Sequence, residues 1–237
     1  IPELLKNCEN NDQAKLMSDL QDLQMAIYEL DRYLETNWRV DSEQLSNYWD
    51  GIYRVLMKMQ YDLDSAKAMC SEIEVYQSHE LLLRKAKWPH QLDLKKYYYY
   101  KSCDVRLMRR IILEKCPVLN KQVLLEDWKF FDFITELNDD IEDVIEDQKS
   151  INGNAFLISY ALEGADYSRN VFSQLIISCL NAQNHYVKQN IPASDWQLRI
   201  QSLSHKYTED CRELMEHQIS ALNDLDNSEI QLFNELK

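Results

Sequence analysis

Asn138-Asp139-Asp140-Ile141-Glu142-Asp143-Val144-Ile145-Glu146-Asp147 is the stretch that decides the expected fold, and it carries six carboxylates between positions 139 and 147. Asp139, Asp143 and Asp147 recur at every fourth residue, so a helix places them on one face within reach of a shared hard cation. The Asn152-Gly153 turn that follows indicates a helix end, where carboxylates oppose the negative end of the helix dipole. Because Mg²⁺ would relieve that repulsion, the stretch predicts a magnesium site.

The same spacing has a second interpretation, an ordinary solvated helix face. On a helical wheel the apolar residues of this helix form one arc and several carboxylates lie nearly opposite. The apolar arc consists of Phe133, Leu137, Ile141, Val144 and Ile145, and the opposite face carries Asp132, Glu136, Asp139 and Asp143. Spacing alone therefore leaves metal binding and a solvated surface both open.

The composition favours a helical protein with an acidic surface. The chain has 237 residues, enough for a sizeable core, but only three Gly and four Pro to form the turns of a sheet-rich fold. A net charge of −14 argues against nucleic acid as the main partner, because phosphate recognition needs a basic surface. No apolar run approaches the length of a membrane span.

The cysteines and histidines are dispersed along the chain. The six cysteines form no C-x-x-C pair, and they are expected to be reduced thiols of a cytoplasmic protein. The histidines form no H-x-x-x-H or E-x-x-H pair, which argues against a zinc or di-iron site. Since the sequence starts at Ile1-Pro2 without Met, we expect that an N-terminal segment, which could include helices of the domain, is missing.

Apolar residues at three- and four-residue intervals predict helices along nearly the whole chain. No repeat or flexible linker separates them, so we expect one all-α domain over 1–237, an antiparallel helical bundle or barrel. The predicted helices cover about 12–37, 43–77, 78–87, 92–115, 121–149, 155–190 and 194–226, with a last turn within 229–236.

The acidic helix resembles the second metal-binding motif of the class I isoprenoid synthases, the superfamily of terpene cyclases, squalene and phytoene synthases and prenyl diphosphate synthases. Asp139-Asp140-Ile141-Glu142-Asp143 matches the D-D-x-x-D motif of the prenyl diphosphate synthases. In the N-D-x-x-S-x-x-x-E motif of terpene cyclases, the three ligand positions fall on Asp139, Asp143 and Asp147. The resemblance extends over about 121–165 and implies the class I isoprenoid synthase fold, with Mg²⁺ bound by Asp139, Asp140, Asp143 and Asp147.

The resemblance also implies a first acidic motif across the cavity. The chain contains no upstream D-D-x-x-D string. The best substitute is Asp31-Arg32-Tyr33-Leu34-Glu35, which is similar to the D-x-x-x-D motif of squalene and phytoene synthases. Asp31 and Glu35 are therefore expected to form the opposing half of the metal site.

Basic residues are expected to meet the charge of the leaving diphosphate. In this superfamily a basic residue just after the second motif contacts diphosphate, and Lys149 occupies that place. An arginine well upstream of the motif senses diphosphate in terpene cyclases, a role open to Arg106 or Lys101, and Lys206-Tyr207 are similar to the pair that binds diphosphate on a late helix. Pairing of these cations with surface carboxylates is the alternative.

The expected function is that of a Mg²⁺-dependent terpene cyclase that ionises an allylic prenyl diphosphate, with Asp139, Asp143 and Arg106 as catalytic residues. A chain-elongating or head-to-head prenyltransferase is the first alternative. A non-catalytic helical protein that presents a solvated acidic helix is the second. The expected partner is the prenyl diphosphate, with a homodimer left open.

Overall fold

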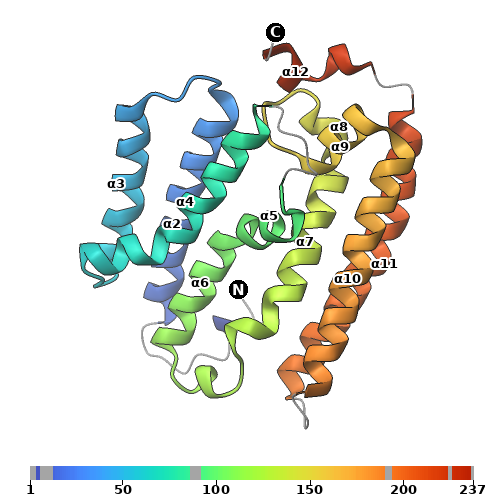
Figure 1. Ribbon diagram of the computed structural model, residues 1–237. Coiled ribbons are helices and arrows are strands. Elements are labelled where there is room, and N and C mark those ends of the chain that lie inside the picture. The colour runs from blue at the N-terminus through green and yellow to red at the C-terminus, as the bar shows by residue number, and fades with distance from the viewer. Residues whose placement is uncertain (1–3, 6–12, 86–91, 190–193, 224–225, 236–237) are drawn as a thin grey trace. The chain divides into compact units, whose positions relative to one another are not determined.

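The computed structural model describes residues 4–5, 13–85, 92–189, 194–223 and 226–235 (Figure 1). Over these residues the chain forms α-helices, short 3₁₀ helices and connecting turns, with no strand. The all-α prediction is therefore confirmed, whereas the isoprenoid synthase type of fold stays a prediction. None of the helices in the described ranges combines the length and apolar character needed to cross a membrane.

The chain divides into two compact units, and each is built from two separate segments. The first unit comprises Ile1–Val75 and Cys103–Gln122, and the second comprises Tyr76–Ser102 and Val123–Lys237. Helix α4, Leu63–Leu83, contributes residues to both units. The single domain expected over 1–237 stays a prediction.

The first unit is centred on α2, Gln13–Thr36, which packs against α3, Ser42–Lys58, and α6, Cys103–Lys115 (Figure 1). Helix α2 closely matches the helix predicted over 12–37, because its apolar residues recur at three- and four-residue steps and form its buried face. These buried residues include Leu16, Leu20, Leu23, Ile27 and Leu30.

The helix predicted over 43–77 is wrong as a single element, because the chain turns between α3 and α4. Gln60 adopts a left-handed conformation with φ of 75°, which ends α3 in a geometry that non-glycine residues rarely adopt. Asp62 then starts α4, since its carboxylate accepts hydrogen bonds from the Ser65 backbone N–H at 2.8 Å and the Ser65 hydroxyl at 3.0 Å. Such a cap satisfies N–H groups that the first helical turn leaves unpaired.

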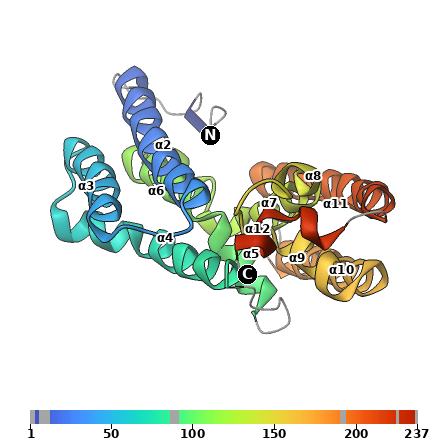
Figure 2. The same cartoon turned by 90° about the horizontal axis from the view of Figure 1, so that it is seen from above.

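The second unit contains an antiparallel pair of long helices, α10, Ala165–Gln189, and α11, Asp195–Leu222 (Figure 1), which also lie side by side when seen from above (Figure 2). Helix α7, Lys129–Glu142, packs against both of them. Two shorter helices, α5 and α9, also pack against α7. They span Leu94–Lys101 and Ala155–Glu163.

Three other predicted helices are also divided. The helix expected over 92–115 breaks at Ser102, between α5 and α6. The helix expected over 155–190 breaks at Gly164, whose φ of 85° suits glycine. The stretch expected as one helix over 121–149 is also divided. A 3₁₀ turn, η2, Leu119–Lys121, ends at its first residue. It is followed by a second 3₁₀ turn, η3, Leu125–Trp128, then by the helix α7 and by the short helix α8, Val144–Asp147. The last turn expected within 229–236 contains α12, Gln231–Glu235, after η4, Asn227–Glu229.

The cysteines only partly match the expectation of reduced thiols. Cys70, Cys103, Cys179 and Cys211 are free, but Cys116 is disulfide-bonded, so the prediction is wrong at that position. Cys8 lies outside the described residues. Since a structural disulfide is more typical of an oxidising compartment than of the cytosol, the cytoplasmic location stays a prediction.

Candidate functional site

The acidic residues 139–147 lie where α7 ends and α8 begins. Asp143 lies between the two helices, directly after the last residue of α7, with φ of −85° and ψ of 3°. Its backbone N–H donates to the Asp139 carbonyl at 2.9 Å, and the Asp147 N–H donates to the Asp143 carbonyl at 2.8 Å. Helical spacing is thus kept across the junction, and the backbone positions of these three residues follow one another by one turn.

Burial divides these carboxylates into two groups. Asp139, Glu142, Asp143 and Glu146 are exposed. Asp140 and Asp147 are buried, with 2% and 9% of their surface exposed. The exposed group is open to a ligand from solvent, whereas the buried group is engaged within the protein.

Asp140 links three parts of the second unit. Its carboxylate forms an ion pair with Lys101 of α5, accepts a hydrogen bond from the Tyr98 hydroxyl at 2.7 Å and accepts another from the Ala155 backbone N–H at 3.0 Å. The last bond places a negative charge at the N-terminus of α9, where the helix dipole stabilises it. Burial lowers the pKa of Lys101, but the charge and hydrogen bond of Asp140, together with the effects of Tyr97 and Glu136, outweigh it and raise this pKa well above its usual value.

Asp147 is held by the loop that follows α8. Asn154 donates from its side-chain amide to the Asp147 carboxylate at 2.8 Å and to the Asp140 carbonyl at 2.6 Å, and its own carbonyl oxygen accepts from the Leu157 N–H at 2.8 Å. Asn152 donates a further hydrogen bond to Asp147 at 3.2 Å. Burial raises the pKa of Asp147, against the opposing effect of these amide donors. Asp140 and Asp147 therefore fix the loop and the start of α9.

The Asp139 carboxylate lies close to other negative charges, and its pKa is shifted. Its pKa is raised by partial burial and by the negative charges of Asp143, Asp140 and Glu142, while Lys101 opposes the shift. A raised pKa in the folded state means that the ionised form costs stability at neutral pH. A divalent cation bound beside Asp139 and Asp143 would remove that repulsion.

We expect the Asp139 carboxyl to titrate above its ordinary value of 3.8, and to move back towards that value in the Asp143→Asn variant, because one of the neighbouring charges is removed. Carboxyl ¹³C NMR titration measures both midpoints. Asp62, whose pKa is lowered by its Ser65 donors, serves as an internal control that should not move. A normal or lowered midpoint for Asp139 in the unsubstituted chain would contradict the crowding.

A groove along α7 and α11 adjoins the exposed carboxylates. It has a volume of about 670 Å³ and brings Asn138 and Glu142 of α7 together with Lys206 and Tyr207 of α11. Asn138 is buried, and its side-chain oxygen has no hydrogen-bond partner among the described residues. The predicted diphosphate ligands Lys206 and Tyr207 thus share a groove with two residues of the acidic stretch. The groove also contains Asp210, Glu213 and His217.

The remaining predicted residues are placed differently. Lys101 is already paired with Asp140, and Arg106, on α6 of the first unit, donates to Glu72 at 2.7 and 3.0 Å. Lys149 is exposed just after α8. Asp31 and Glu35 lie on α2 of the first unit, so their expected position opposite Asp139 stays a prediction.

Two residues that support the site were not identified from the sequence, Tyr98 and Asn154. Tyr98 and Lys101 are three residues apart on α5 and therefore share a helix face, which was a usable signal within the Tyr97–Tyr100 run. Asn154 precedes α9 as a side-chain cap, and Asn is favoured at that position. Its bonds to Asp140 and Asp147 depend on the folded loop and have no signature in residue spacing.

The exposed part of the site offers too few ligands to hold a metal ion by protein groups alone. Within the described part of the chain, no cluster of three or more His, Cys, Asp or Glu residues is arranged to hold a metal. Asp139 and Asp143 can supply two carboxylates, so a Mg²⁺ ion with its near-octahedral preference would take its other oxygens from water and from an anionic ligand. Comparison of the chain with family models, with curated proteins and with solved structures finds no match.

Proposed function

We propose that the chain binds Mg²⁺ together with a prenyl diphosphate at Asp139 and Asp143, and acts as a terpene cyclase of the class I isoprenoid synthase type. The observation that carries the proposal is the pair of exposed carboxylates one turn apart at the end of α7. Partial burial and the neighbouring carboxylates raise the pKa of Asp139, and a bound cation would relieve the repulsion among these carboxylates. The resemblance of the acidic motif and the all-α fold are consistent with this activity.

The buried network gives this pair a rigid base. Asp140 and Asp147 tie α7 and α8 to α5 and to the start of α9, so the exposed carboxylates project from a helix end that is fixed on several sides. Preorganised ligands avoid the cost of ordering flexible side chains when the cation and diphosphate arrive. Asp140 is thus assigned a positioning role and not that of a metal ligand.

The chemistry of the proposed reaction requires that the leaving diphosphate be stabilised as its bond to the allylic carbon breaks heterolytically. Bound Mg²⁺ would neutralise part of that charge. Lys206 and Tyr207, in the groove beside Glu142, can donate hydrogen bonds to phosphate oxygens. Lys101 acts indirectly in this scheme, through its ion pair with Asp140.

The Asp143→Asn variant tests the binding step. Calorimetric titration of the unsubstituted chain with Mg²⁺ should give strong binding only when inorganic diphosphate is present, because the anion completes the coordination shell. Loss of one charged ligand should weaken that binding at least about tenfold. Glu163→Gln removes the same charge from an exposed position at the end of α9 and should change the affinity little. Equal binding by Asp143→Asn and the unsubstituted chain would exclude Asp143 as a ligand.

Product analysis tests the catalytic step. The chain is incubated with Mg²⁺ and geranyl, farnesyl or geranylgeranyl diphosphate, and the hydrocarbon or alcohol products are identified. A cyclised product without diphosphate supports the cyclase, whereas a longer prenyl diphosphate, formed when isopentenyl diphosphate is added, would indicate chain elongation. Binding of Mg²⁺-diphosphate without any turnover would leave only the binding function.

A non-catalytic helical protein is the second candidate. It is favoured by the pairing of the predicted diphosphate sensors, since Lys101 contacts Asp140 and Arg106 contacts Glu72. In that case Asp139 and Asp143 form a solvated face, and neither Mg²⁺ nor diphosphate binds to it. The calorimetric titration separates the two candidates.

A further inference from the structure

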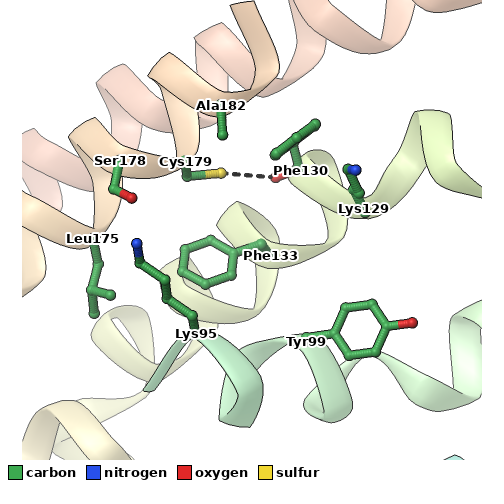
Figure 3. A pocket seen from close by; sticks show the side chains of 9 residues that line it. All are labelled: Lys95, Tyr99, Lys129, Phe130, Phe133, Leu175, Ser178, Cys179 and Ala182. Atoms are coloured by element: carbon green, nitrogen blue, oxygen red, sulfur yellow. Dashed lines mark hydrogen bonds between the residues drawn. The ribbon is translucent and has the colours of Figure 1, made fainter. Parts of the chain in front are cut away.

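An apolar pocket in the second unit lies apart from the acidic residues, at the other end of α7. It is formed by residues of α5, α7 and α10 and has a volume of about 200 Å³ (Figure 3). Phe133 and Leu175 form much of its apolar wall, with Tyr99 at one side. The pocket belongs entirely to the second unit.

The charged residues of the pocket are both lysines. Lys95 of α5 and Lys129 of α7 line it, and no carboxylate does. Within the described ranges neither lysine forms an ion pair. This local excess of positive charge occurs in a chain with a net charge of −14, so it is not a consequence of overall composition.

The two ammonium groups are placed at different parts of the pocket. The Lys129 Nζ lies 4.8 Å from the centre of the Phe130 ring and 4.9 Å from that of Tyr186, and such cation–π contacts favour this position. The Lys95 side chain instead extends past Phe133 towards Leu175 and Ser178 of α10 (Figure 3). Lys95 is therefore the cation that reaches into the apolar part of the pocket.

Cys179 completes the wall without adding charge. Its thiol donates a hydrogen bond to the Phe130 carbonyl at 3.5 Å. Burial raises the pKa of Cys179 to about 12, so the thiol is neutral at physiological pH and behaves as a small apolar group. A negative charge that enters the pocket thus meets cations and no competing anion.

We propose that this pocket binds a short aliphatic carboxylate, with its tail between Phe133 and Leu175 and its carboxylate beside the Lys95 ammonium group. The volume is below the range of drug-sized sites, so it suits a short tail. Lys129 adds positive potential at the rim. The proposal is independent of Mg²⁺ and diphosphate binding at Asp139 and Asp143.

Octanoate is a suitable probe, and calorimetric titration of the whole chain measures its affinity. Lys95→Met keeps a long side chain but removes the charge, and it should weaken binding about tenfold or more, since a charge-assisted hydrogen bond is lost. Lys129→Met should have a smaller effect in the same direction. Lys96→Met is the matched control, because Lys96 is an exposed neighbour outside the pocket, and it should leave the affinity within about twofold.

A second variant tests the location of the tail. Ala182 is an exposed lining residue of α10, so Ala182→Trp fills the pocket from its rim without disturbing a buried contact, and octanoate binding should disappear while the helical circular dichroism is unchanged. Octanol, which has the same tail but no charge, should bind at least about tenfold more weakly than octanoate. The proposal is overturned if octanoate does not bind, if octanol binds equally well, or if Lys95→Met and Lys96→Met behave alike.

Discussion

Asp140→Ala should lower the free energy of unfolding by about 3–5 kcal/mol, because it leaves the charged Lys101 ammonium group without its buried partner. The Asp140 side chain is 3% exposed and that of Lys101 is 17% exposed, so water replaces the lost carboxylate poorly. The substitution also removes the acceptor for the Tyr98 hydroxyl and for the Ala155 N–H. Urea denaturation followed by circular dichroism measures the change.

Two further variants separate the effect of leaving the Lys101 charge unpaired from the effect of removing the other contacts of Asp140. Asp139→Ala removes the adjacent but exposed carboxylate and should change stability by no more than about 0.5 kcal/mol. The double variant Asp140→Ala/Lys101→Met should be more stable than Asp140→Ala alone, because no unpaired ammonium group is left in the interior. If the single Asp140 variant were as stable as the Asp139 variant, the network would not hold the acidic end in place.

Phe172→Ala should destabilise the second unit by about 3–5 kcal/mol, the usual cost of emptying a large aromatic site in a core. Phe172 is fully buried and lies perpendicular to Phe156, with ring centres 4.9 Å apart. It also meets Tyr98 edge to face at 6.5 Å. The cavity left by the Phe172 side chain would therefore lie next to Tyr98, whose hydroxyl binds Asp140.

Ile177→Ala, five residues further along α10, is the control for this truncation, because Ile177 is 44% exposed. Truncation of the Ile177 side chain should lower the free energy of unfolding by no more than about 0.5 kcal/mol. Thermal unfolding of the three proteins should thus show a large fall in the midpoint for the Phe172 variant alone. Comparable midpoints for the two alanine variants would mean that Phe172 is not part of a tightly packed core.

Apolar periodicity predicted the helices well where a single buried face runs the length of the element. This holds for α2, which lies within one residue of its predicted bounds at each end. Periodicity failed at Gln60 and Ser102, where two helices with similar patterns meet at a turn. Neither turn contains Gly or Pro, and the local signal for a break was therefore weak.

The division of the acidic stretch into exposed and buried carboxylates could be predicted only in part. The wheel placed Asp139 and Asp143 away from the apolar arc, and both are exposed. It placed Asp132 on the same polar face, but Asp132 is 2% exposed. Burial of Asp140 depends on Lys101 and Tyr98, and residue spacing carries no information about partners so distant along the chain.

The division of each unit between two segments has a consequence for biosynthesis. Protein domains usually fold in order of synthesis, with the N-terminal one first. Here the segment Tyr76–Ser102 cannot complete its unit until Val123–Lys237 has been synthesised. Until the ribosome has passed α7, Lys101 has no Asp140 to pair with. A fragment starting at Val123 would retain Asp140 but lack both Lys101 and Tyr98. Dissection of this chain into separately expressed units therefore needs a rearranged gene and not a simple truncation.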